Sequence, residues 1–95
     1  MNYYALLYDV VDDYIIRRAA FRDEHLRLAN EANKRGELLL GGAFTDPADR
    51  TLLIFHVNEK SIVENFVKHD PYVINGLVTR WEIRQWNVVI GSDQL

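Results

Sequence analysis

The sequence lacks cysteine altogether, and its 95 residues include only two prolines and five glycines. Without cysteine the chain has no disulfide, no thiolate nucleophile and no cysteine-ligated zinc, so it needs no oxidising compartment. It also lacks an apolar run long enough to cross a bilayer, and the start MNYYALLYDVVDD has neither the basic region nor the long apolar core of a signal peptide. We therefore expect a cytoplasmic protein that does not bind a membrane.

Basic residues are not concentrated anywhere in the chain, whose net charge is -3. Scattered lysines and arginines in an acidic chain do not attract a phosphate backbone, so nucleic acid is not an expected partner. The composition, 48% hydrophobic and 26% charged, is typical of a folded globular protein. The length suits a single domain, residues 1–95, of a size at which burial against a partner subunit is a useful addition.

The first third of the chain predicts a strand followed by a helix. Residues 3–10, YYALLYDV, are rich in aromatic and branched side chains, and both faces of the predicted strand are apolar. Asp12 or Asp13 can cap a helix whose apolar positions recur at helical spacing as far as Ala32. Gly36 can take the left-handed conformation that ends a helix. We therefore predict one helix between these aspartates and Gly36.

The middle of the chain predicts a hairpin and a second helix. Residues 37–44 and 51–57 have the composition of strands and flank a turn-rich connection. Asn58 is expected to cap a helix that ends at Asp70, because Pro71 disfavours helical geometry in the residue before it.

The last predicted strand, residues 78–90, follows a short turn that contains Asn75 and Gly76. Its apolar side chains change from odd to even positions along the strand, which predicts a bulge or a break near Gln85. Residues 91–95 are expected to be frayed.

The order strand, helix, strand, strand, helix, strand predicts a ferredoxin-like α+β sandwich with an antiparallel sheet. Two helices can cover only one face of that sheet, yet the first three strands are apolar on both faces. An uncovered aromatic face would be a large adhesive patch. We therefore expect a homodimer that packs sheet against sheet, with a different protein as the alternative cover.

The predicted first helix carries Arg18, Arg22 and His25 at spacings of four and three, so these side chains share one side of it. One interpretation is a solvated basic stripe. The other is that His25, whose ordinary pKa lies near neutrality, carries a proton while Arg22 holds an anion.

Three segments of the sequence resemble those of the YciI-like family. They are RDEHL at residues 22–26, RGELLLGG at residues 35–42, and DPYV at residues 70–73 with Gly76 after it. The resemblance spans residues 3–90 and implies a dimeric α/β barrel whose pocket is centred on a histidine and an aspartate, here His25 and Asp70, with Arg22 nearby. Gln85 and Ala43 depart from prolines that are common in the family, which puts the shape of the pocket wall in doubt.

The resemblance also implies a chemistry. A carboxylate such as Asp70 can fix the tautomer of His25 and stabilise the imidazolium that forms when the ring accepts a proton. The family includes an enzyme that removes hydrogen chloride from a chlorinated hydroxyhydroquinone, and it has also been associated with hydrolysis. We therefore expect proton transfer on a small ring or carbonyl compound without a cofactor, ending in elimination or isomerisation. The alternative is a non-catalytic module that binds a small molecule or assists a larger enzyme.

Other residues have a structural interpretation beside the functional one. Tyr72, Phe44 and Trp81 are candidate substrate contacts, although aromatic residues in so small a chain also serve as core. Asp70 can simply stop a helix or close a turn before proline. A metal site would need two or three of His25, His56 and His69 to converge with a carboxylate, and none has the spacing of metal ligands, so no metal is expected. His69 is interpreted as a cation in the last turn of a helix.

Overall fold

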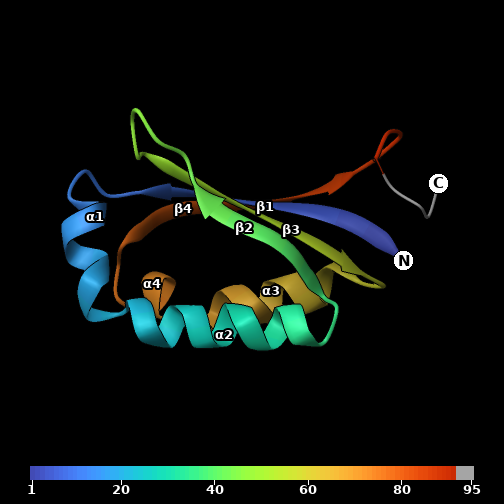
Figure 1. The fold of residues 1–95 in the computed structure, drawn as a ribbon, viewed down its shortest axis with the longest axis horizontal. Helices are drawn as coiled ribbons and strands as arrows, with labels where there is room; N and C mark the ends of the chain where they lie inside the picture. The colour runs from blue at the N-terminus through green and yellow to red at the C-terminus, as the bar shows by residue number, and fades with distance from the viewer. Residues whose placement is uncertain (92–95) are drawn as a thin grey trace.

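The computed structural model describes residues 1–91 and contains one four-stranded antiparallel sheet with all of its helices on one face (Figure 1). The strands are β1 (Asn2–Val10), β2 (Leu38–Ala43), β3 (Arg50–Val57) and β4 (Val78–Trp86), in the spatial order β2-β3-β1-β4. The helices are α1 (Tyr14–Arg17), the 3-10 helix η1 (Arg18–Ala20), α2 (Arg22–Lys34), α3 (Lys60–His69) and α4 (Pro71–Ile74). This arrangement confirms the predicted ferredoxin-like α+β fold.

The core lies between the helices and the covered face of the sheet. β1 pairs with β3 on one side and with β4 on the other, so Leu6 lies between Leu53 and Ile83, and all three side chains are buried. Helix α3 adds Val63 and Phe66 to the same cluster. Burying a side chain of this size stabilises the fold by about 1.5–3 kcal/mol relative to leaving it in water.

The prediction of one helix between Asp13 and Gly36 is wrong, because the segment forms α1, η1 and α2 with a break at Phe21. Because of the break, α1 and α2 pack into different clusters. Tyr14 is buried in a small cluster with Tyr72 and Leu77, whereas residues of α2 such as Ala32 join the main core. The end of α2 is as predicted, with Gly36 at a φ of 79°.

The second helix, α3, begins one residue later than predicted, with Glu59 rather than Asn58 at its cap. It ends at Asp70 as expected, and Asp70 has the extended conformation that a following proline favours. Pro71 then occupies the first position of α4, a single helical turn where the sequence predicted only a short turn.

The bulge, or break between two strands, that was predicted near Gln85 is wrong, and the strand predicted over residues 78–90 ends at Trp86. β4 is regular as far as Trp86, and the irregular pairing lies at its start, where Val10 pairs with Val78 after Asp9 has paired with Arg80. Trp86 pairs with Tyr3 on the open face of the sheet, together with the polar side chains at the other even positions. The change of apolar phase therefore reflects an apolar residue on the open face and not an inserted residue.

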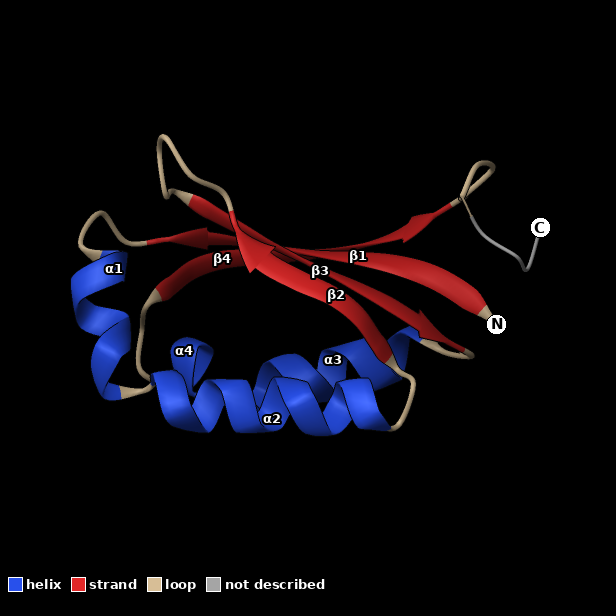
Figure 2. Cartoon of the chain, viewed as in Figure 1, coloured by secondary structure: helices blue, strands red, loops and turns tan. Residues whose placement is uncertain are grey.

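No helix within residues 1–91 lies on the open face of the sheet (Figure 2). This face is nonetheless apolar near its centre, where Ala5 and Leu7 of β1 pair with Ile54 and Leu52 of β3. None of the helices within residues 1–91 is long and apolar enough to cross a membrane. Residues 92–95, most of the end that was expected to be frayed, lie outside the described part of the chain.

Candidate active site

The junction between α3 and α4 places the carboxylate of Asp70 in the interior, where none of its surface is exposed. A buried carboxylate needs hydrogen-bond donors to offset the loss of its hydration. Asp70 has three: the Tyr8 hydroxyl donates to Oδ2 at 2.8 Å, the Tyr72 backbone N–H donates to Oδ1 at 3.0 Å, and Nδ1 of His25 lies 2.8 Å from Oδ1. Asp70 thus ends α3 before the proline, as its structural interpretation predicted. It also caps α4, which the sequence did not predict, and contacts His25.

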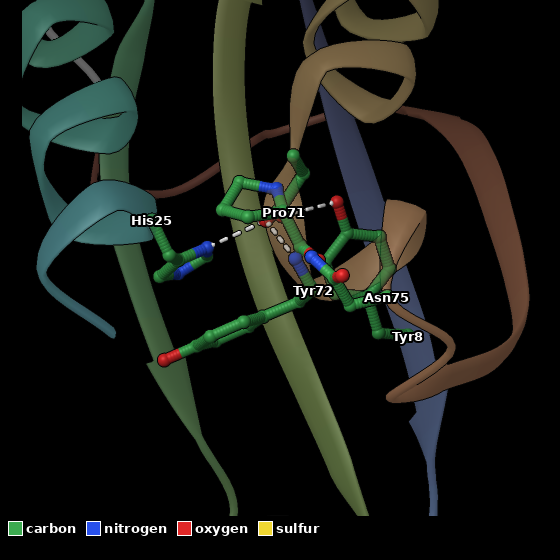
Figure 3. Close-up of polar contacts among 6 residues, drawn as sticks. Tyr8, His25, Pro71, Tyr72 and Asn75 are labelled. Atoms are coloured by element: carbon green, nitrogen blue, oxygen red, sulfur yellow. Dashed lines mark hydrogen bonds and ion pairs between the residues drawn. The ribbon is translucent and has the colours of Figure 1, made fainter. Parts of the chain in front are cut away.

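His25 lies in the first turn of α2 and is 45 residues from Asp70 in the sequence. In Figure 3, the side chain of His25, from helix α2, and the side chain of Tyr8, from strand β1, extend toward each other from opposite sides. An ionised carboxylate can only accept hydrogen bonds, so Nδ1 of His25 carries the proton in this contact. The neutral ring then has its lone pair on Nε2, which makes no hydrogen bond to any residue in the described range 1–91.

The ring of Tyr72 is stacked on the ring of His25, with 3.9 Å between centroids and an angle of 8° between planes (Figure 3). Tyr14 contacts the edge of Tyr72 at 5.7 Å between centroids, and the guanidinium carbon of Arg18 lies 5.2 Å from the centroid of the Tyr14 ring. The imidazole therefore has a fixed plane, set by Asp70 at its edge and by Tyr72 on its face.

A cavity of about 250 Å³ lies between α2 and strands β2 and β3, and His25 is part of its wall. Its polar lining includes Arg18, Arg22, Tyr14 and Tyr72. Leu26, Ala29 and Leu53 contribute apolar surface. Gly41 and Ala43 of β2 also line it, so small residues form part of its wall. The cavity has the mixed lining of a site for a small organic molecule.

The tyrosines around the site keep their protons at neutral pH. Burial, more than any other cause, raises the pKa of Tyr72 to about 12, and it also raises the pKa of Tyr14. The pKa of Tyr8 is raised as well, because burial and the adjacent charge of Asp70 both disfavour a phenolate. All three hydroxyls are therefore hydrogen-bond donors at neutral pH, and His25 is the lining residue suited to accept a proton.

Thr51 on β3 is one unusual feature of the cavity wall. Its side chain lines the cavity and is only 5% exposed, yet its hydroxyl oxygen has no hydrogen-bond partner among residues 1–91. It lies between Tyr8 of β1 and Ala43 of β2 in the sheet. An unpaired buried hydroxyl costs about 1–3 kcal/mol.

The residues predicted as substrate contacts divide into two groups. Arg22 and Tyr72 line the cavity with His25. Phe44 follows β2 and is 44% exposed, and Trp81 is on β4 at the opposite edge of the sheet, so neither is part of the cavity wall. Their role in binding stays a prediction.

The side chains of the other two histidines make their contacts with residues other than Asp70. Nδ1 of His69 donates to the carbonyl oxygen of Asn65 at 2.8 Å in the last turn of α3, and His56 stacks on Tyr3 with 4.2 Å between centroids. Within residues 1–91, no three histidine or acidic side chains converge as a metal site would require.

Sequence reasoning missed three residues of the site: Tyr8, Tyr14 and Arg18. Tyr8 could have been suspected, because a tyrosine on the buried side of a strand needs a partner for its hydroxyl. Arg18 was noted only for its spacing from Arg22. Tyr14 had no local signal, because its place depends on the break in the helix.

The comparisons with known proteins agree on the fold. The model of the YCII-related domain matches residues 1–87. Among solved structures, the chain is similar to 5-chloro-2-hydroxyhydroquinone dehydrochlorinase (TftG) from Burkholderia phenoliruptrix, solved in complex with 2,5-dihydroxybenzoquinone. That similarity has a TM-score of 0.76 and 16% identity, and it covers 90% of this chain and 93% of the other.

Two further structures are similar at lower scores. A structural-genomics target protein from Agrobacterium tumefaciens has a TM-score of 0.63 and 14% identity, with 98% of each chain covered. A candidate antibiotic biosynthesis monooxygenase from Deinococcus radiodurans has a TM-score of 0.58 and 14% identity, with 98% of this chain and 97% of the other covered. No curated protein matches the sequence. Identities this low establish the shared fold alone.

Proposed function

The chain belongs to the YCII-related domain family, and from that premise we propose that it is a proton-transfer enzyme in which His25 is the base and Asp70 orients it. The observation that carries this proposal is the 2.8 Å hydrogen bond between Nδ1 of His25 and Oδ1 of Asp70. It leaves Nε2 as the ring nitrogen able to accept a proton from a molecule in the cavity. Asp70 and the face of Tyr72 then stabilise the imidazolium that forms.

The proposed step balances without a cofactor. A C–H or O–H bond of the ligand breaks, its proton moves to Nε2 of His25, and its electron pair forms a C=C or C=O bond. In an elimination, chloride leaves with the electron pair of its bond to carbon; in an isomerisation, His25 returns the proton to a different carbon. No serine or cysteine nucleophile lines the cavity within the described residues, which favours proton transfer over acyl transfer. Arg22 is positioned to hold an anionic group of the ligand.

The similar dehydrochlorinase supplies a specific reaction to propose, namely loss of hydrogen chloride from a chlorinated hydroxyhydroquinone. At 16% identity its activity does not transfer by similarity. The test is to measure chloride release from 5-chloro-2-hydroxyhydroquinone, corrected for spontaneous loss, by the wild type and three variants. Those variants are His25→Gln, Asp70→Asn and, as a control, His69→Gln.

We expect His25→Gln to lower the rate about 100-fold or more, the usual range for a general base. Asp70→Asn lowers it as well, because an amide that donates to Nδ1 moves the ring proton to Nε2, the wrong nitrogen. His69→Gln removes a histidine next to Asp70 in sequence that contacts only a helix carbonyl, and it leaves the rate unchanged. Equal rates in all four proteins contradict the proposal; binding of the quinol without chloride release identifies a binding module instead.

We propose further that residues 1–95 act as one domain and that the open face of the sheet pairs with the same face of a second copy. The support is the apolar centre of that face, which includes Leu7 and Leu52, on a sheet whose other face already has its helices. A contact between two such faces removes apolar surface from water on both chains. Size-exclusion chromatography with light scattering measures the mass, and a monomer at micromolar concentration contradicts this part of the proposal.

A further inference from the structure

The polar lining of the cavity differs in charge from the chain as a whole. We propose that the cavity binds a small organic anion and that Arg18, together with Arg22, binds its charged group. This inference rests on the proposed function in that it assigns the class of ligand for the same cavity. The sequence places Arg18 only in a basic stripe with Arg22 and His25 and assigns it no ligand contact.

The charged side chains that line the cavity have one sign, and the carboxylate of Asp70 lies behind His25 with none of its surface exposed. The whole chain has 14 acidic and 11 basic residues, yet the lining residues within the described range include Arg18 and Arg22 and no aspartate or glutamate. Neither guanidinium forms an ion pair with a carboxylate in residues 1–91, whereas the neighbouring Arg17 pairs with Asp13 at 3.8 Å. Two guanidinium groups that line one cavity and lack a carboxylate partner within residues 1–91 favour an anionic ligand.

The uncharged polar groups of the cavity point to the same class of ligand. The hydroxyls of Tyr14 and Tyr72 stay protonated at neutral pH because burial raises their pKa values, to about 12 for Tyr72. They are therefore available as donors to an oxygen atom of the ligand. A wall with two cations and two phenolic donors suits a carboxylate or an enolate better than a neutral or cationic ligand.

The rest of the wall indicates that the anion is organic. Leu26, Ala29 and Leu53 line the cavity with apolar surface, which an inorganic anion would leave unused. The volume of about 250 Å³ exceeds the roughly 150 Å³ cavity that holds benzene in an engineered protein. It therefore has room for one six-membered ring with substituents.

The position of Arg18 also connects the charged group to the base. Its guanidinium lies over the ring of Tyr14, Tyr14 contacts the edge of Tyr72, and Tyr72 stacks on His25. This sequence of contacts exists because the break at Phe21 separates Arg18 from α2. An anionic group held by Arg18 and Arg22 would place the rest of a small ring beside His25.

The test uses benzoate and benzamide, which share a size and shape but differ in charge at neutral pH. Dissociation constants are measured by NMR titration of the full chain, with the amide signals of Gly41 and Gly42 as reporters of the cavity. The variants are Arg18→Gln, which removes the proposed contact, and Arg18→Lys, which keeps the charge without the planar fork. The matched control is Arg17→Gln, which removes the same charge one residue away and outside the cavity wall.

We expect the wild type to bind benzoate at least tenfold more tightly than benzamide, and Arg18→Gln to lose about tenfold in benzoate affinity with little change for benzamide. Arg18→Lys should lose less, and Arg17→Gln should match the wild type. Equal affinity of the wild type for the two probes overturns the inference, as does an equal loss in the Arg17 and Arg18 variants. Sulfate that competes as well as benzoate at matched ionic strength overturns the organic part.

The result of the benzoate binding test is independent of the result of the proton-transfer test. A charge preference that depends on Arg18 without any reaction that depends on His25 would leave the anion site in place and contradict the enzyme. A reaction that depends on His25, without a charge preference that depends on Arg18, would support the enzyme and contradict the anion site.

Discussion

Both faces of the sheet carry apolar side chains, but their surroundings differ. On the covered face, Leu6 of β1 is fully buried beneath the helices, and Tyr8 reaches from the same face to the carboxylate of Asp70. Because side chains alternate along a strand, Leu7, the next residue of β1, lies on the open face. The covered face thus holds the core and the candidate site, whereas no helix within residues 1–91 covers the apolar side chains of the open face.

The difference shows that the alternation of one strand can serve two purposes at once. Side chains on the covered face determine how a single chain folds, since they pack against α2 and α3. Side chains on the open face contribute fully only when another surface covers them. Mutations on the two faces should therefore differ in size and in their dependence on protein concentration.

The largest difference is expected between Leu6→Ala and Leu7→Ala. Leu6→Ala leaves a cavity in the core and should lower the free energy of unfolding by about 2–5 kcal/mol at any protein concentration. Leu7→Ala should cost less, and its cost should grow with concentration, because it acts through a second copy. Urea denaturation at two concentrations measures both effects. Equal, concentration-independent costs would mean that no second copy covers the open face.

Next in size is the effect of placing a charge on the open face. Leu52 pairs with Leu7 at the centre of this face, so Leu52→Glu puts a carboxylate where we propose that two copies meet. We expect a folded monomer in light scattering, with the far-UV circular dichroism of the wild type. If the variant remains a dimer, its interface does not include the open face.

A smaller effect is expected for Tyr8→Phe on the covered face. It removes one of the three donors to Asp70 and should lower the free energy of unfolding by about 1–3 kcal/mol at neutral pH. The pKa of Tyr8 is raised in the folded protein above its ordinary value of 10.0. Its contribution is therefore complete below pH 10 and is lost as the pH rises further.

The wild type and Tyr8→Phe should consequently converge in stability above pH 10. Urea denaturation across that range, at constant ionic strength, measures the convergence. A constant difference between the two proteins would mean that Tyr8 titrates alike in the folded and unfolded chains.

The smallest effect is expected for Thr51→Val, also on the covered face. It replaces an unpaired buried hydroxyl with a methyl group of similar shape, so the free energy of unfolding should rise by up to about 1 kcal/mol. Thr79→Val is the matched control, because the Thr79 hydroxyl is exposed and donates to the carbonyl oxygen of Asp9 at 3.2 Å. It should be neutral or slightly destabilising. A loss of stability in Thr51→Val would show that its hydroxyl has a partner such as water in solution.

Much of the fold was predictable because strands and helices carry their periodicity locally. The alternation in residues 3–10 identified β1 and its two apolar faces, and Pro71 correctly ended α3 at Asp70. The error near Gln85 has a physical cause. The bulge near Gln85 was predicted by assuming that apolar side chains share the covered face, but Trp86 lies on the open face with Tyr3.

The candidate site was less predictable from local pattern. His25 and Asp70 were identified through a family resemblance, and spacing alone could not bring together two residues that are 45 positions apart. The tyrosines around them depend on packing between separate elements. Tyr14 contacts Tyr72 because the helix breaks at Phe21, and the sequence has no proline or glycine at that position that would predict the break.

The sequence by itself determined the order of the elements, the class of fold and the apolar character of both sheet faces, because each follows from the chemistry of neighbouring residues. Tertiary structure alone decided which polar groups meet. Asp70 is adjacent to His69 in the chain but bonds His25, since α3 ends with His69 turned toward its own helix carbonyl and α4 turns the carboxylate inward. A side chain's partner depends on the path of the backbone on both sides of it, and that path is set by the packing of the whole domain.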